Sequence, residues 1–96
     1  MAPRSLTPAR DDQSRPPLFT LEEWRAIVRT LGLSPRQAQV VGLAIQSKRN
    51  KEIARILGTS ERTIRTHVDE SRRRLRAIDR MALAYRVMEV FRRDVE

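Results

Sequence analysis

Residues 50–76 have the sequence NKEIARILGTSERTIRTHVDESRRRLR, and this stretch predicts two helices joined by a short turn. In the first part, over residues 51–57, apolar side chains recur at helical intervals. Asn50 is a suitable cap for that short helix, and Gly58 can end it in the left-handed backbone conformation. The segment therefore predicts a compact helix that stops at a glycine turn.

The second part predicts a longer helix over residues 61–76, with Ser60 as its cap. Ile64 and Val68 lie on the side that faces back toward the first helix, where Ala54 is small enough for close approach. Two helices joined by a short glycine-containing turn form a helix-turn-helix when their spacing fits, as it does here.

The outward face of the longer helix predicts contact with DNA bases. It carries Arg62, Arg65, Thr66, Asp69 and Arg73. Arginine can bind guanine through two hydrogen bonds, and threonine can contact either base of a pair. Between Lys48 and Arg76 there are ten cations against four acids, a charge that DNA phosphates would neutralise. Taken alone, the run of arginines would also fit a solvated helix face.

The composition favours a nucleic-acid-binding protein in the cytoplasm, associated with the nucleoid. The 96 residues carry a net charge of +8, and arginine supplies 18 of the 20 cations. Without cysteine, and with one histidine, neither a metal site nor another cofactor is expected. No apolar run approaches the roughly 20 residues that cross a membrane, and the N-terminus lacks the apolar centre of a secretory signal. No nucleophile–base pair stands out, so an enzyme is not expected.

The remaining sequence divides into three parts. Residues 1–18 contain four of the five prolines and predict a disordered tail. Residues 19–32 predict an additional helix, in which Thr20 forms a capping box and Trp24 anchors the core. Residues 33–96 predict the main domain with its C-terminal dimerisation helix.

Two further caps complete an all-α prediction with five helices. Ser34 caps the first helix of the main domain, with Pro35 at its first position and Gln37 completing the capping box. Asp79 caps the last helix.

Residues 33–70, LSPRQAQVVGLAIQSKRNKEIARILGTSERTIRTHVDE, resemble the LuxR/FixJ-type (GerE-like) DNA-binding domain of bacterial regulators. The motifs "LSPR", "NKEIA" and "SERTIRTHV" carry the resemblance, which extends to Phe91. It implies a tetrahelical domain whose third helix lies in the major groove and whose last helix can form dimers. The chain departs from the family by having Gln37 in place of a glutamate, and by adding the N-terminal helix to a stand-alone domain.

The resemblance and the charge pattern together predict the DNA-binding residues. By resemblance, the base-contacting residues are Arg65, Thr66 and Asp69, to which the outward face adds Arg62. The phosphate-contacting residues are Asn50, Lys51, Thr63, Arg72 and Arg73 by resemblance, Lys48 by its charge and His67 through a ring nitrogen. Asp69 occupies a position that is often basic or neutral in the family. There it weakens phosphate binding but can select a cytosine amino group.

The last helix has two apolar stripes, and the second one needs a partner. Leu83, Val87 and Val90 form the stripe for which dimerisation is expected. The additional N-terminal helix could cover it instead. A dimer would place two recognition helices on an inverted repeat, about one DNA turn apart.

The function predicted from the sequence is a sequence-specific, dimeric transcription regulator that binds double-stranded DNA, with RNA polymerase as a further partner to consider. No membrane or small-molecule ligand is expected. Two alternatives remain open. One is a sigma-factor-like promoter-reading domain, suggested by "SRRRLR"; the other is an adaptor that uses its basic face to bind an acidic protein.

Overall fold

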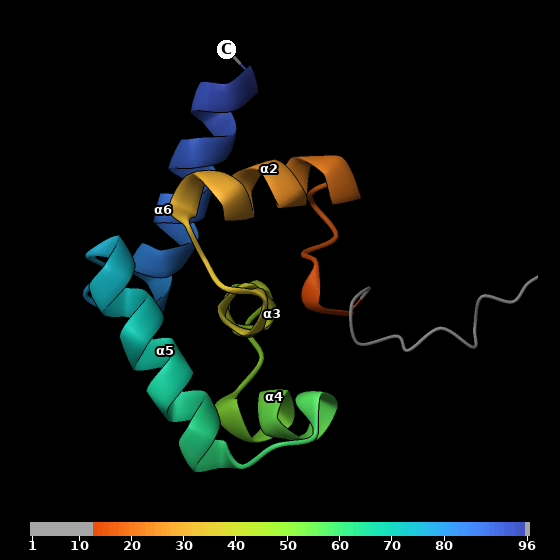
Figure 1. Cartoon of the computed structure of the whole chain (residues 1–96), viewed down its shortest axis with the longest axis vertical. Helices are drawn as coiled ribbons and strands as arrows, with labels where there is room; N and C mark the ends of the chain where they lie inside the picture. The colour runs from red at the N-terminus through yellow and green to blue at the C-terminus, as the bar shows by residue number, and fades with distance from the viewer. Residues whose placement is uncertain (1–12, 96) are drawn as a thin grey trace, which may run out of the picture.

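The computed structural model of the chain describes residues 13–95, and these residues contain helices and no strand. The helices are α2 (Leu21–Leu31), α3 (Pro35–Ala44), α4 (Asn50–Leu57), α5 (Glu61–Leu75) and α6 (Arg80–Val95). The all-α prediction is therefore confirmed. Figure 1 shows α3 end-on near the centre, with α2 on one side of it, α4 on the other, and α5 alongside.

Helix α3 is buried on both sides and separates two apolar clusters. The helix-turn-helix cluster consists of Val40, Leu43, Ala44, Ile53, Ala54, Leu57, Ile64 and Val68. The α2–α6 cluster consists of Phe19, Trp24, Ile27, Leu33, Ala38, Val41, Leu75, Ala77, Leu83, Val87 and Val90. Val40 and Val41 are both fully buried and face opposite clusters. The core helix α3 thus joins the additional helix α2 to the helix-turn-helix of α4 and α5.

Most of the predicted caps are present. The backbone N–H of Glu23 donates to the Thr20 hydroxyl at 3.1 Å, and Glu23 accepts from the Thr20 N–H at 2.8 Å. Ser34 and Gln37 make the same reciprocal pair. Ser60 accepts from the N–H of Thr63, and Asp79 from the N–H of Ala82. These bonds satisfy amides that have no partner within their own helices.

Asn50 is not the cap of α4, contrary to the prediction. Helix α4 begins at Asn50 itself, and the residue before it, Arg49, has the extended backbone of a cap. The N–H of Arg49 donates to Oε1 of Glu52 at 2.9 Å. The side-chain oxygen of Asn50 instead accepts from Arg80 at the start of α6. A tertiary partner has therefore taken the group that would have capped the helix.

Residues 13–19 lie against α3, whereas the predicted tail included residues up to 18. Gln46 Nε2 donates to the carbonyl of Gln13 at 2.9 Å, and Ser14 is 4% exposed. The ring of Phe19 packs 6.1 Å from Trp24 and 5.0 Å from Phe91, centroid to centroid. These aromatic contacts hold the segment on the domain. The rest of the predicted tail, residues 1–12, lies outside the described residues.

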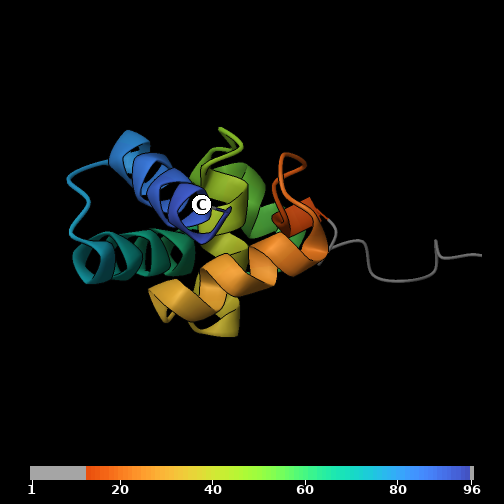
Figure 2. The same ribbon diagram turned by 90° about the horizontal axis from the view of Figure 1, so that it is seen from above.

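Helix α6 uses its stripe of Leu83, Val87 and Val90 inside the chain, so the prediction that these residues form the dimer surface is wrong. Leu83 and Val87 are fully buried and Val90 is 9% exposed. Figure 2 shows α2 and α6 in the view from above, and both contribute to the α2–α6 cluster. The additional helix covers this stripe, as the alternative explanation proposed.

The opposite face of α6 is the one left uncovered. Met81 is 81% exposed, Tyr85 66% and Met88 41%, and Ile78 in the preceding loop is also exposed. Because α2 covers the stripe that was predicted for dimerisation, the other apolar stripe of α6 is the one available to a partner. Among the described residues, no helix has the length and apolar character needed to cross a membrane.

Candidate nucleic-acid interface

One face of α5 is anchored in the domain, and this sets the direction of the opposite face. Ile64 is fully buried, Val68 is 6% exposed, and Ser71 is buried on the same side. Ser60 fixes the start of the helix, and its own hydroxyl donates to Oγ1 of Thr63 at 2.9 Å. The helix is held as a rigid cylinder, with its outer face turned to solvent.

Three of the four predicted base-contacting residues are exposed on that outer face. Arg62 and Arg65 are exposed, and neither guanidinium has a hydrogen bond or ion pair within residues 13–95. Thr66 is also exposed, and its hydroxyl donates to the Arg62 carbonyl at 3.2 Å. The threonine rotamer is thereby defined, while its oxygen still has acceptor capacity. The arrangement presents two free guanidinium groups and one ordered hydroxyl on one side of a helix.

Asp69, the fourth predicted base-contacting residue, is paired with Arg72. Arg72 Nη1 lies 3.1 Å from Asp69 Oδ1, and Nη2 donates to the carbonyl of Ile78 at 2.7 Å. Both side chains are partly exposed, at 46% for Asp69 and 35% for Arg72. Arg72 was predicted to contact phosphate. In the structure its guanidinium instead links α5 to the loop before α6.

The other predicted phosphate-contacting residues divide into free and engaged groups. Lys51 and Arg73 are exposed, and Lys48 is half-buried. Thr63 is exposed and accepts from Ser60, whereas the Asn50 side chain is occupied by Arg80. The exposed cations therefore come from both helices of the motif, as a surface that follows a phosphate backbone requires.

His67 is half-buried beside Glu70. Its Nδ1 lies 3.8 Å from Oε1 of Glu70, which is too long for a hydrogen bond. That nitrogen is buried and has no hydrogen-bond partner. The ring therefore packs on the helix.

Arg80 is a structural residue of the motif that sequence reasoning missed. Its guanidinium donates to the Lys48 carbonyl and to Oδ1 of Asn50. Burial lowers the pKa of Arg80 below its ordinary value. These bonds fasten the start of α6 to the start of α4. No local pattern could have revealed them, because about 30 residues separate the partners.

The acid at the start of α4 is held in its ionised form. The pKa of Glu52 is lowered because its carboxylate accepts the backbone N–H of Arg49 and because Lys48, Arg49 and Arg55 are near it. A carboxylate in the first turn also interacts favourably with the helix dipole. Glu52 therefore belongs to the helix cap, and the exposed cations of the motif remain available.

The fold and this surface define a helix-turn-helix domain of the DNA-binding class. Residues 31–87 match the family described as bacterial regulatory proteins, luxR family. Since the match covers more than half of the chain, the chain belongs to that family, and the resemblance seen in the sequence is confirmed. The matched region begins at the last residue of α2 and ends within α6.

A relative with a curated description is the transcriptional activator protein CarR of Pectobacterium carotovorum subsp. carotovorum. The two sequences are 37% identical over 71 residues, which make up 74% of this chain and 26% of the relative. The chain thus spans about a quarter of the length of that relative. No solved structure matches the chain.

Proposed function

We propose that this chain is a sequence-specific transcription regulator that binds double-stranded DNA with α5 in the major groove. The observation that carries the proposal is the outer face of α5, where Arg62 and Arg65 are exposed and unpaired while Ile64 and Val68 fix the helix from behind. A major groove admits one α-helix, and arginine is well suited to guanine there. Membership of the luxR family supports the same assignment.

In this proposal, Lys51, Arg73 and Lys48 contact phosphates on either side of the groove, and the Thr63 hydroxyl and a ring nitrogen of His67 approach the backbone. Asn50 and Arg72 were both predicted to contact phosphate, but their side chains make hydrogen bonds within the domain, to Arg80 and to the Ile78 carbonyl respectively. We assign them to positioning α4 and α5. Asp69 has Oδ1 occupied by Arg72, which leaves its second oxygen for a cytosine amino group.

The test is duplex binding by the full chain, using a site selected from random DNA. Arg65→Ala should weaken binding to that site by roughly 1–3 kcal/mol and relax the preference at one base pair. Arg25→Ala is the matched control, because Arg25 is exposed on α2, away from the motif. Fluorescence anisotropy with the selected duplex and a scrambled duplex measures both effects. If Arg65→Ala bound both duplexes with wild-type affinity, the proposal that α5 lies in the major groove would be wrong.

We further propose that the chain acts as a homodimer on an inverted repeat, through the exposed face of α6. Met81, Tyr85 and Met88 form an apolar surface next to Ile78, and water covers it in the single chain. Half-sites about one DNA turn apart would follow from the symmetry of two recognition helices. A monomer mass at every concentration in sedimentation, with and without DNA, would contradict the dimer.

The two alternative functions receive less support from the structure. One of the two acidic groups that favoured an adaptor is compensated, since Asp69 pairs with Arg72. The family match favours a luxR-type regulator over a sigma-factor-like domain. Binding to core RNA polymerase in the absence of DNA would favour the sigma-factor-like domain. The absence of any salt-sensitive duplex binding at low ionic strength would favour the adaptor.

A further inference from the structure

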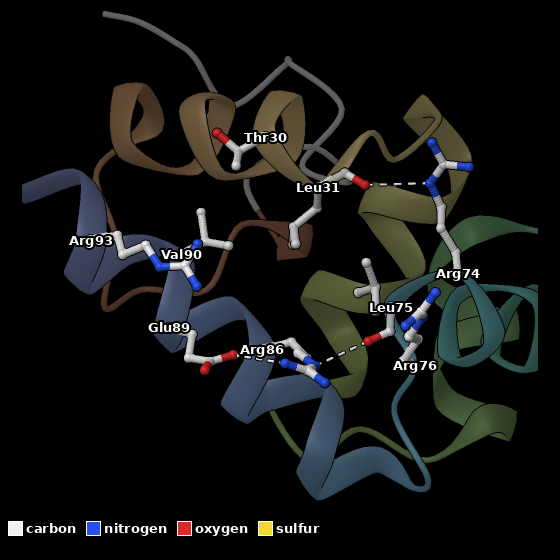
Figure 3. A pocket seen from close by; sticks show the side chains of 9 residues that line it. All are labelled: Thr30, Leu31, Arg74, Leu75, Arg76, Arg86, Glu89, Val90 and Arg93. Carbon is white, nitrogen blue, oxygen red and sulfur yellow. Dashed lines mark hydrogen bonds and ion pairs between the residues drawn. The ribbon is translucent and has the colours of Figure 1, made fainter.

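A pocket of about 440 Å³ lies where the ends of α2 and α5 meet α6, and cationic side chains surround it. Figure 3 shows its lining, which comprises Thr30, Leu31, Arg74, Leu75, Arg76, Arg86, Glu89, Val90 and Arg93. The four guanidinium groups and the one carboxylate of this set leave a net charge of +3. We propose that this pocket, which we call the arginine pocket, binds a small molecule that carries two or more phosphate charges.

Two of the four arginines are held in place by the protein. Arg74 Nε lies 3.3 Å from the carbonyl of Leu31, the last residue of α2. Arg86 Nε donates at 3.0 Å to the carbonyl of Leu75, the last residue of α5, and its Nη1 to Glu89 at 3.0 Å. These bonds use Nε of both arginines and Nη1 of Arg86, and they leave both Nη groups of Arg74 and Nη2 of Arg86 for a ligand. Guanidinium groups fixed in this way lose little freedom on binding an anion.

The guanidinium groups of the other two arginines, Arg76 and Arg93, make no hydrogen bond or ion pair with the side chains that the structure describes, and both residues are exposed. In Figure 3 their side chains extend toward the pocket from the end of α5 and from α6. Repulsion among cations at one site is unfavourable unless an anion joins them. A ligand with several phosphate oxygens would satisfy these groups through paired N–H···O bonds.

Arg76 ends α5 beside the pocket. Its φ is 55°, in the left-handed region that glycine adopts without steric cost and that other residues seldom occupy. This conformation makes Arg76 the C-cap of the helix, because its backbone N–H donates to the carbonyls of Arg72 and Arg73. The cap fixes the point from which the Arg76 side chain reaches the pocket lining.

The pocket lies at the C-terminal end of α5, beyond the proposed base-contacting residues, and has the size of a small-molecule site. Arg76 follows Arg65 by 11 residues, which corresponds to roughly 16 Å along a helix. Leu31, Leu75 and Val90 give the pocket apolar walls, and its volume falls in the range of ligand pockets. Part of its lining, including Thr30 and Arg93, lies outside the region matched by the family. We therefore favour a small phosphorylated molecule over the phosphates of bound DNA.

Isothermal titration calorimetry of the full chain with pyrophosphate, at constant ionic strength, tests the proposal. We expect saturable one-to-one binding. Arg93→Gln and Arg76→Gly should each weaken it roughly tenfold or more, as expected for losing a hydrogen bond to a charged group. Glycine suits the backbone of Arg76, so Arg76→Gly removes the side chain without disturbing the fold. Arg92→Gln is the matched control, because Arg92 is the exposed neighbour of Arg93 but does not line the pocket.

Two results would overturn the proposal. One is the absence of saturable binding to the wild-type chain at millimolar pyrophosphate. The other is an equal loss of affinity in Arg92→Gln, which would show that only the overall charge matters. Duplex binding by the same variants separates the sources of phosphate. If Arg76→Gly and Arg93→Gln lose duplex affinity while pyrophosphate does not bind, these arginines contact DNA. If pyrophosphate binds but Arg65→Ala binds duplex DNA as the wild type does, the proposed DNA surface on α5 is wrong and the arginine pocket stands.

Discussion

Gly42 shows at the scale of one residue how the N-terminal segment is attached. It lies in the middle of α3, a position where glycine lowers helix stability relative to alanine. A Cβ atom at this position would overlap the carbonyl oxygen of Ser14 and lie 3.1 Å from Cζ2 of Trp24. The missing side chain thus lets residues 13–15 approach the helix directly.

We expect Gly42→Ala to destabilise the protein by roughly 1–3 kcal/mol, because the overlapping atom belongs to the backbone and cannot rotate away. The gain in helix propensity, at most about 1 kcal/mol, acts in the opposite direction. Urea unfolding measures the change in free energy. Amide exchange should also quicken at Phe19, whose N–H donates to the Pro16 carbonyl at 3.0 Å. Unchanged stability together with unchanged exchange would show that the segment does not occupy this place.

The lowered pKa of Glu52, again a property of one residue, predicts that the stability of the protein depends on pH. Its pKa in the folded state lies below the ordinary value of 4.5, chiefly because of the bond from the Arg49 N–H. A group with a lowered folded-state pKa stabilises the protein above its unfolded-state pKa, and the contribution is lost as pH falls through the folded-state value. Glu52→Gln should therefore lower the urea midpoint at neutral pH, and the difference from wild type should vanish well below pH 4.5.

A suitable control for this titration is Glu61→Gln, which removes a carboxylate from the first turn of α5. Glu61 makes no bond of this kind to a cap residue within the described chain. If both substitutions gave the same pH profile, general charge effects would explain the result and the specific bond from Arg49 would not.

At the scale of the element, α6 has two faces with different roles. Leu83 is fully buried against the α2–α6 cluster, whereas Met81 is 81% exposed. Leu83→Ala should lower the free energy of unfolding by roughly 2–5 kcal/mol, because it leaves a cavity in the core. Met81→Glu should change monomer stability by no more than about 0.5 kcal/mol. Thermal or urea unfolding compares the two variants.

Met81→Glu also tests the proposed dimer. In sedimentation experiments Met81→Glu should shift the mass from dimer to monomer, since a buried, unpaired carboxylate is unfavourable at an apolar interface. Tyr85→Glu should have the same effect, because Tyr85 belongs to the same exposed face. A dimer that persists in both variants would place the interface elsewhere on the molecule.

At the scale of the whole molecule, which carries a net charge of +8, exposed arginine and lysine side chains gather on two surfaces in particular. One is the motif, with free cations such as Lys51, Arg65 and Arg73. The other is the arginine pocket at the far end of α5. Because α3 contributes to both apolar clusters, the two surfaces belong to one packed unit.

Duplex affinity should therefore fall steeply with salt, since each phosphate contact releases counterions. Lys51→Ala and Arg73→Ala should each reduce the slope of log affinity against log salt by about 1, with similar losses on specific and random DNA. Anisotropy titrations over a range of salt concentrations measure the slope, with Arg25→Ala as the control. An unchanged slope for both variants would remove these residues from the phosphate contacts.

Local patterns predicted the parts of the structure that depend on neighbouring residues. The caps at Thr20, Ser34, Ser60 and Asp79 follow from bonds between residues three positions apart. Likewise, the helical spacing of Ile64 and Val68 defined the outer face of α5 without any other element. Such features require no knowledge of the partner helices.

The sequence by itself determined the helices, most of their caps, the helix-turn-helix and the family. Only the tertiary structure decided which stripe of α6 is buried, where Arg72 and Arg80 bind, and that residues 13–19 lie on α3. The physical reason is the range of the interactions. Caps and helical periodicity act within about one turn, whereas a buried face or a distant hydrogen bond depends on which other element of the chain packs against it.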